Sequence, residues 1–501
     1  MPIYASPLMT SRKTKFARLL KKPIFQSVAW NVAGGVIHKC SLFVAITLAG
    51  RLLGQKSFGE LGYVRSTINS FVSFTGFGTG SALTKFISEF QEKDAKSTAS
   101  FLLFGLSFVS ILSLSIAITI FFFASLIADQ VGKIELTSKL QIGCLLVIGI
   151  SLTSALFGAL AGFKEFFKTA VAQMVTGVIA LPLILTATYY YQVEGAIVGL
   201  FLAAMIQNTL MAWGLFTICR QRRLKFSFSE MPKTARTMLC FSLPLVLSGM
   251  MIGPMNWLAD SIFAKSNEGL AELGVYFAAL QINLMIQTIN LTLGQVLFPY
   301  CVENIAKGSR AFEAVNILLP WAIGLAVTLP VLIFPELLNV IWGDKFSRDT
   351  LRIVGVFECV TAIIIASKQG IARDVIAKHR VWLSFSSSLV WGVTLIVFAF
   401  LLQDLGAIGR SSAAVSAYLV NTIIFIPVFV IQGICSRKLV ACLPAMAIWT
   451  LIGLIVFLQL QFEISAPARL LILLVSVSFI ALAFKTIYKN FTLEESALSQ
   501  N

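Results

Sequence analysis

The chain has 501 residues, of which 57% are hydrophobic and only 12% are charged, and its formal net charge is +16. This composition excludes a soluble globular protein, and apolar runs of about twenty residues recur along the whole chain, as in a polytopic helical membrane protein. In a soluble protein the positive charge would suggest a nucleic-acid partner. In a membrane protein basic residues gather in loops on one side of the bilayer, so we expect membrane lipids, and no nucleic acid, as their partners.

The apolar runs predict an all-α fold with about fourteen transmembrane helices. In chain order the expected spans cover residues 27–50, 62–88, 99–124, 138–160, 169–191, 195–218, 237–262, 273–299, 313–341, 350–367, 381–402, 406–434, 440–460 and 466–487.

The distribution of basic residues predicts the orientation of these spans. With the N-terminus in the cytoplasm, the cytoplasmic segments hold 27 of the 39 lysines and arginines, the outer loops hold 10, and Lys39 and Arg65 lie within spans. Basic residues concentrate on the cytoplasmic side of membrane proteins. We therefore expect both termini to be cytoplasmic.

Two short repeated segments indicate an internal duplication. Glu60–Gly62 recurs as Glu272–Gly274 at an offset of 212 residues, and Gly195–Ile197 recurs as Gly406–Ile408 at an offset of 211. Each pair opens the corresponding helix of its half, which predicts two parallel six-helix lobes with a substrate cavity between them.

The duplication gives the expected organisation of the chain. It comprises a basic N-terminal tail, an N-lobe of spans 1 to 6, a basic linker, a C-lobe of spans 7 to 12, two further spans and a C-terminal tail. These segments are 1–26, 27–218, 219–236, 237–434, 435–488 and 489–501.

Two cations lie at unusual depth in the expected spans. Lys39, next to His38, is halfway along the first span, and Arg65 is in the second. A cation at the bilayer centre costs about 2.5–3.5 kcal/mol on insertion scales, so it normally faces a protein interior or a water-filled cavity. A buried cation without a nucleotide-binding or metal-binding motif indicates a transporter of an anionic substrate, and we expect no catalytic residue, metal site or cofactor.

Polar stripes at helical spacing accompany these cations. Such stripes of Gly, Ser and Asn mark close helix packing more often than a transport path, but packing does not explain Lys39 and Arg65. The stripe residues that we expect to line the cavity are Asn31, Asn69, Asn256, Asn283, Gln287 and Asn290.

Two acidic residues within the spans are candidates for coupling to H⁺ or Na⁺. Glu358 is expected either to take a proton or to pair with a basic partner at the end of its span, and we favour the pairing. Asp260 and Arg410 lie near the outer ends of their spans, where snorkelling to the interface accounts for both.

Several segments resemble the Wzx-type polysaccharide flippases of the multidrug/oligosaccharidyl-lipid/polysaccharide (MOP) exporter superfamily. The resemblance covers about residues 27 to 488. The segments that carry it are Gly50–Gly54, Phe58–Gly62, Gly78–Leu83, Gly158–Phe163 and Gly195–Ile197.

This resemblance implies a bacterial inner-membrane protein that moves undecaprenyl-diphosphate-linked oligosaccharides for O-antigen, capsule or exopolysaccharide synthesis, with polysaccharide polymerase machinery as a candidate partner. It also implies a central cavity in which Lys39, Arg65 and His38 meet the diphosphate. The amides would then contact the glycan, because amides both donate to and accept from hydroxyl groups.

Two other functions are alternatives for this sequence. A cation-coupled multidrug or metabolite exporter of the same superfamily would need carboxylates in its cavity, for which Glu358 and Asp260 are the candidates. A membrane-embedded glycosyltransferase or polymerase would need a large catalytic outer loop, and the expected outer loops are short.

Overall fold

The computed structural model describes residues 23–75, 77–224, 234–239, 250–307, 310–378, 380–462 and 464–498. The secondary structure assigned in these ranges is helical, without a strand. Eleven of the described helices are long and apolar enough to cross a membrane. The predicted all-α polytopic class is therefore confirmed.

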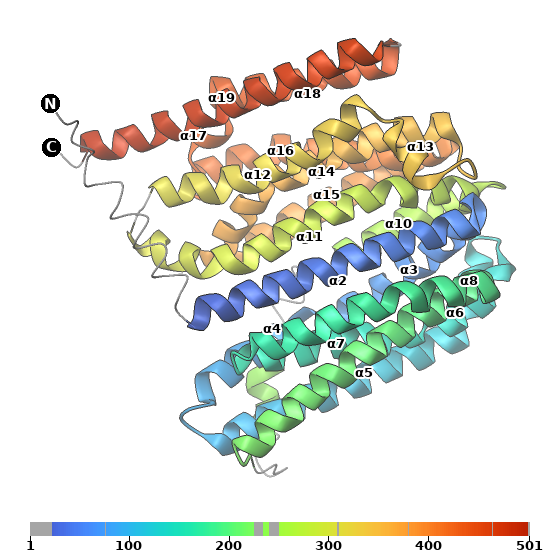
Figure 1. Ribbon diagram of the computed structural model, residues 1–501, viewed down its shortest axis with the longest axis vertical. Coiled ribbons are helices and arrows are strands. Elements are labelled where there is room, and N and C mark those ends of the chain that lie inside the picture. The colour runs from blue at the N-terminus through green and yellow to red at the C-terminus, as the bar shows by residue number, and fades with distance from the viewer. Residues whose placement is uncertain are drawn as a thin grey trace, which may run out of the picture.

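The N-terminal half forms one group of helices, which occupies the lower part of Figure 1. A break in α8 at Tyr191 and Gln192, where the backbone is not helical, separates the fifth and sixth expected spans, while α3 and α4 together form the second. The elements are α2 (Pro23–Leu53), α3 (Gln55–Thr75), α4 (Phe77–Phe90), α5 (Ala95–Gln130), η1 (Ile134–Leu136), α6 (Thr137–Gly143), α7 (Leu145–Gly162) and α8 (Phe166–Gln221).

The C-terminal half forms the second group, and its last two long helices, α18 and α19, pack on the outside of that group at the top of Figure 1. The elements are α10 (Ile252–Ala264), α11 (Gly269–Lys307), α12 (Arg310–Ile333), α13 (Leu337–Trp342), α14 (Arg348–Ala377), α15 (Val381–Leu401), η2 (Gln403–Leu405), α16 (Gly406–Ile431), α17 (Arg437–Val440), α18 (Leu443–Gln461) and α19 (Ala466–Leu498).

These helices are compatible with fourteen spans. Part of the seventh expected span, at residues 240–249, lies outside the described residues. In Figure 1 the start of α2 and the end of α19 lie at the same end of the bundle. This matches an even number of spans, whereas the side of the membrane on which the termini lie stays a prediction.

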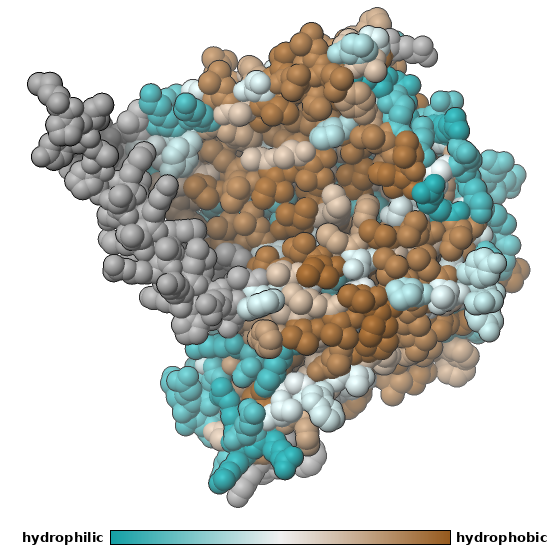
Figure 2. All heavy atoms as spheres, in the orientation of Figure 1, coloured by the Kyte–Doolittle hydropathy of each residue, from teal (hydrophilic) through white to brown (hydrophobic). Residues whose placement is uncertain are grey.

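The outside of the bundle suits a lipid environment. Figure 2 shows hydrophobic residues over the middle of the visible face, with hydrophilic residues gathered towards its ends. Large side chains such as Phe122, Trp213 and Ile431 are exposed on the surface of the protein. In a bilayer such a surface faces the hydrocarbon core.

The two lobes meet along α3, which packs against α10 and α11, and along α2, which also packs against α11. The contact is close because glycines line it on both sides. A Cβ atom on Gly59 would lie 1.6 Å from the carbonyl oxygen of Leu270, and one on Gly274 would lie 2.0 Å from that of Gln55. The two segments that carry the Glu-Leu-Gly repeat thus face each other across the seam, as elements related by a two-fold axis would.

Candidate functional site

Two cavities lie on either side of α3. The first, here called the N-lobe cavity, has a volume of about 520 Å³ and extends among α2, α3, α7 and α8. The residues of its wall that carry polar groups are His38, Lys39, Arg65, Asn69, Thr153, Ser154, Gln173 and Gln207.

The second cavity, here called the interlobe cavity, has a volume of about 290 Å³ and lies between α3 of the N-lobe and α10, α11, α14, α15 and α16 of the C-lobe. Arg65 and Asn69 line both cavities, so α3 is their common wall. Of the residues predicted for the site, Asn256, Asp260, Asn283, Gln287 and Glu358 line the interlobe cavity.

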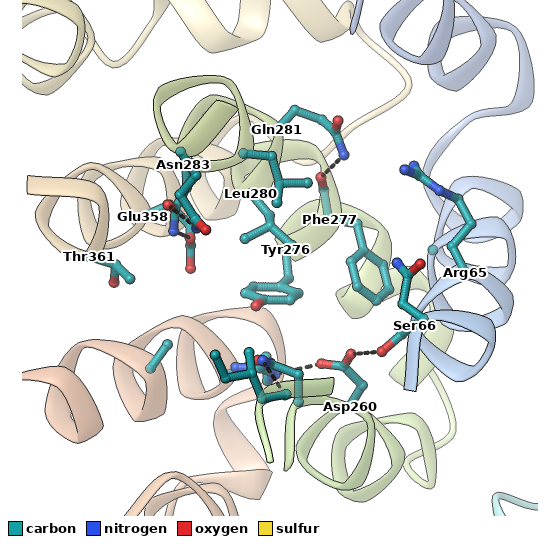
Figure 3. A pocket seen from close by; sticks show the side chains of 18 of the residues that line it. Arg65, Ser66, Asp260, Tyr276, Phe277, Leu280, Gln281, Asn283, Glu358 and Thr361 are labelled. Carbon is teal, nitrogen blue, oxygen red and sulfur yellow. Dashed lines mark hydrogen bonds and ion pairs between the residues drawn. The ribbon is translucent and has the colours of Figure 1, made fainter. Parts of the chain in front are cut away.

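Lys39 and Arg65 carry charge that nothing in the described part of the chain neutralises. Neither side chain has an ion pair or a hydrogen bond with a described residue. Lys39 is exposed and lines the N-lobe cavity, and Arg65 is partly buried. In Figure 3 Arg65 projects from its helix with no interaction drawn to it. The structure therefore brings together the two cations that the sequence predicted, on a cavity wall.

His38 lies deeper than Lys39. The Nδ1 atom of His38 is buried without a hydrogen-bond partner, and its backbone lies against Gly177 of α8, where a Cβ would come within 2.9 Å of the His38 Cα. The imidazole still lines the N-lobe cavity. Gln173 and Gln207, which line the same cavity, were not predicted, because amides in a hydrophobic span carry no distinctive spacing.

Arg410 and Asp260 form a buried ion pair, which overturns the expectation that both snorkel to the interface. Arg410 is 0% exposed and Asp260 is 2% exposed. The Arg410 Nε donates to Asp260 Oδ1 at 2.7 Å, and its Nη2 donates to Asn256 Oδ1 at 2.9 Å. The face of α16 that carries Arg410 packs against α10 and α11, so the charge is compensated inside the protein.

The same ion pair reaches across the seam between the lobes. Ser66 of α3 donates to Asp260 Oδ2 at 2.5 Å, and the hydroxyls of Tyr63 and Ser261 are 3.0 Å apart. Figure 3 shows Ser66 and Asp260 meeting at the edge of the interlobe cavity. The C-lobe carboxylate therefore joins the two lobes as well as holding Arg410.

Glu358 does not have the basic partner that we favoured. It is 1% exposed, accepts a hydrogen bond from Asn283 Nδ2 at 3.0 Å, and has no ion pair with a described residue. Gln287 Nε2 in turn donates to Asn283 Oδ1 at 2.9 Å. The other carboxylate oxygen, Oε1, is buried without a partner. The pairing expectation is wrong because α14 continues well beyond Glu358 on both sides, so the residue is deep in the helix rather than at a span end.

Two predicted glycan residues lie elsewhere. Asn31 and Asn290 line neither of the two cavities, although both are buried and carry amide atoms without a hydrogen-bond partner. Helical spacing put them on the same stripes as the cavity residues. It did not show where along each helix the cavity ends.

Sequence reasoning missed a cation in the C-lobe. Lys368 was placed beyond the tenth span, but α14 runs on to Ala377, and the Lys368 ammonium donates to Asn421 Oδ1 at 2.5 Å and to Thr422 Oγ1 at 3.2 Å. A hydropathy window ends a span at the first charges, so it cut α14 short.

The arrangement suits an amphiphilic anion. Uncompensated cations stabilise a phosphate group that has left bulk water, and a guanidinium can bind it with two parallel hydrogen bonds. The amides beside them suit hydroxyl groups. The cavity walls therefore combine the two chemistries that a phosphorylated sugar presents.

Comparison with known proteins gives the family. Residues 24–305 match the family described as polysaccharide biosynthesis protein. The stage V sporulation protein B of Bacillus subtilis is 21% identical over 443 residues, which cover 81% of this chain and 83% of that protein. The EPS I polysaccharide export inner membrane protein EpsE of Ralstonia nicotianae is 23% identical over 389 residues, covering 75% and 86% respectively.

Solved structures share the fold. An inward-facing multidrug resistance transporter of the MATE family, in the MOP superfamily, has a TM-score of 0.61 at 17% identity, covering 81% of this chain and 95% of that one. A MOP superfamily transporter from Pyrococcus furiosus, described as having a binding pocket of reverse polarity, has a TM-score of 0.57 at 19% identity, covering 83% and 97%. The predicted resemblance is confirmed, and the chain belongs to the polysaccharide biosynthesis protein family, with the fold of a MOP superfamily transporter.

Proposed function

We propose that this protein is a flippase that carries undecaprenyl-diphosphate-linked oligosaccharides across the bacterial inner membrane for the synthesis of a surface polysaccharide. The observation that supports it most is the pair of uncompensated cations, Lys39 and Arg65, on the walls of cavities that also carry amides. The Ralstonia relative is named as a polysaccharide export protein, which agrees with this substrate class.

The diphosphate would bind at Lys39 and Arg65, with His38 beside them. A phosphate group loses favourable hydration when it enters a cavity within the membrane, so it needs charged donors in return. Both cations have their donors free of described partners, and Arg65 is reached from both cavities. The glycan would contact Asn69, Asn256, Asn283 and Gln287, which extend from Arg65 along the interlobe cavity.

Transport would proceed by alternating access of this cavity region. The lobes are joined at one end of the bundle by close backbone contacts between α3 and α11. Rocking of one lobe against the other about a central site is the general mechanism of transporters built from repeats. The release of the α3–α11 seam would expose the cavities at that end.

Glu358 is the stronger of the two candidates for coupling to H⁺ or Na⁺. Both oxygens of Asp260 already accept hydrogen bonds, from Arg410 and Ser66, whereas Glu358 Oε1 has no partner and lies on the cavity wall. Ionisable groups within membrane spans commonly mark proton or ion pathways. This carboxylate is also the feature that favours the alternative function, a cation-coupled multidrug or metabolite exporter.

The test is the sidedness of lipid-linked oligosaccharide in cells that lack the gene and carry wild-type protein, Lys39→Ala, Lys39→Arg or Lys265→Ala. We expect deletion to leave the intermediate on the cytoplasmic side, wild type and Lys265→Ala to restore its transfer, and Lys39→Ala to fail. Lys39→Arg keeps the positive charge and should restore part of the transfer. Lys265 is the matched control because it is an exposed lysine that lines neither cavity.

Two outcomes would contradict the proposal. Unchanged lipid-linked oligosaccharide in the deletion strain would exclude the flippase function, and a gain of sensitivity to cationic drugs in that strain would support the exporter instead. Wild-type transfer by Lys39→Ala would leave a flippase but would remove Lys39 from the substrate path.

A further inference from the structure

Each lobe sends one lysine across the seam, at the end of the bundle that carries α13 in Figure 1. The Lys133 ammonium of the N-lobe donates to the carbonyl oxygen of Asn267, which lies between α10 and α11 of the C-lobe, at 3.1 Å. The Lys345 ammonium of the C-lobe donates to the carbonyl oxygen of Leu52, at the end of α2 in the N-lobe, at 2.7 Å. The two hydrogen bonds therefore cross between the lobes in opposite directions.

The internal duplication relates these two lysines. Lys133 and Lys345 are 212 positions apart, which is the offset of the repeated Glu-Leu-Gly segments. Each closely follows a glycine in the left-handed region, Gly132 with a φ of 67° and Gly343 with a φ of 77°, and these glycines are 211 positions apart. Other residue types are strained in that region, so glycine allows the same sharp turn in both loops. Chance placement of exposed side chains would not give two cross-seam bonds at equivalent positions of a repeat.

The two acceptors suit a cation. The last carbonyl groups of a helix have no partner within that helix and carry the negative end of its dipole. Leu52 is the last residue but one of α2, and Asn267 follows shortly after the end of α10 at Ala264. Each lysine thus binds at the C-terminal end of the first long helix that the structure describes in the opposite lobe.

These contacts lie where the interlobe cavity is closed. Along α3 the seam residue Gly59 comes just before the cavity residues Gly62 and Arg65. Along α11 the seam residue Gly274 likewise comes just before the cavity residue Tyr276. The seam therefore separates the cavity from the end of the bundle at which both lysines cross.

We propose that Lys133 and Lys345 form a two-fold related latch that holds the lobes closed over the interlobe cavity at this end. This inference rests on the proposed alternating access, in which the lobes separate here. Both hydrogen bonds are exposed, so water replaces them when the lobes part. Because the latch is made only in the closed state, it lowers the fraction of molecules that are open at this end. It does so without contact to the substrate.

The test measures how quickly a reagent reaches the interlobe cavity from the seam end. In a cysteine-free background Leu284→Cys is the reporter, because Leu284 lines this cavity and is 37% exposed. A membrane-impermeant maleimide is added to sealed vesicles of either orientation, which carry the reporter alone or with Lys133→Met, Lys345→Met, both substitutions, or Lys265→Met. Lys265 is the matched control because it is exposed and lies beside Asn267 in the same loop, without a described partner across the seam.

We expect labelling from the seam side to rise about threefold in each single latch variant and about tenfold in the double variant, the effect of losing one and two exposed hydrogen bonds. Lys265→Met should label as slowly as the reporter alone. Labelling of the double variant at the rate of the reporter alone, or an equal rise in Lys265→Met, overturns the latch. Failure of the flippase proposal looks different, because it appears as a lack of lipid-linked oligosaccharide transfer by the wild type, whereas labelling needs no substrate.

Discussion

At the residue scale, burial and partners decide what each charge does. Arg410, Lys39 and Arg65 all lie in membrane-spanning helices, but only Arg410 has a carboxylate within ion-pair distance among the described residues. A paired charge supports the fold, whereas an uncompensated charge in a cavity is available to a ligand. All three residues can be seen in the sequence, but the sequence does not show which of them has a carboxylate partner.

The buried pair gives a prediction about stability. Asp260→Leu leaves Arg410 buried without compensation, which costs about 3–5 kcal/mol. We expect a marked fall in the unfolding temperature of the purified protein. The double variant Asp260→Leu/Arg410→Met removes both charges and should recover much of the loss, because the pair then leaves no uncompensated charge.

A thermal unfolding series in one detergent measures both effects as a double-mutant cycle. The loss of stability in the double variant could instead equal the sum of the losses in Asp260→Leu and Arg410→Met. The two residues would then be energetically independent, and the ion pair would not be what stabilises this site.

At the element scale, the approach of α3 to α11 depends on the absence of side chains at the seam. The Gly59 position faces the backbone of α11, and the Gly62 position faces the Phe277 ring, where a Cβ would lie 2.0 Å from the nearest ring atom. Small residues allow helices in membranes to pack closely. The glycines that mark the family resemblance in α3 therefore have a packing role between the lobes.

Gly59→Ala should weaken this seam. Its Cβ would meet the Leu270 carbonyl, and a backbone atom cannot rotate away as a side chain can. We expect a lower unfolding temperature for Gly59→Ala. Gly453→Ala, in α18, is the control of opposite sign: nothing lies within 4 Å of its Cβ position, and alanine is favoured over glycine in a helix by about 1 kcal/mol. Equal unfolding temperatures for the two variants would show that α3 and α11 adjust freely to each other.

At the scale of the whole molecule, the loop between α13 and α14 of the C-lobe binds the N-lobe at the end of the bundle where α3 and α11 are in contact. The Lys345 ammonium donates to the carbonyl oxygen of Leu52 at 2.7 Å, and the Ser347 amide donates to Gln55 Oε1 at 3.0 Å. Phe58 packs on Trp342 with ring centroids 5.0 Å apart. The proposed alternating access would require these contacts to separate.

Cross-linking across this contact should therefore stop transport. In a cysteine-free background, Gln55→Cys with Ser347→Cys is joined by a short bis-maleimide, and we expect loss of lipid-linked oligosaccharide transfer with undecaprenyl diphosphate still bound. The control pair, Asp344→Cys with Arg348→Cys, lies within the C-lobe, where Arg348 and Asp344 form an ion pair at 2.6 Å. Transfer by the linked interlobe pair at the rate of the control would exclude a separation of the lobes at this end.

The sequence by itself determined the membrane class, the helical fold, the family and the two cations on the cavity walls. These features follow from local properties: apolar length, glycine motifs, and the cost of placing a cation such as Lys39 within a bilayer. Each can be read from one helix at a time.

Only the tertiary structure decided which polar residues meet. Arg410 and Asp260 are 150 positions apart, and Trp391 reaches the interlobe cavity from a helix whose sequence resembles any lipid-facing span. Hydrophobicity does not distinguish a lipid-facing side from a side packed on another helix, because lipid tails are as apolar as leucine. The pairing of charges and the C-lobe wall of the cavity therefore became visible only when the helices were packed together.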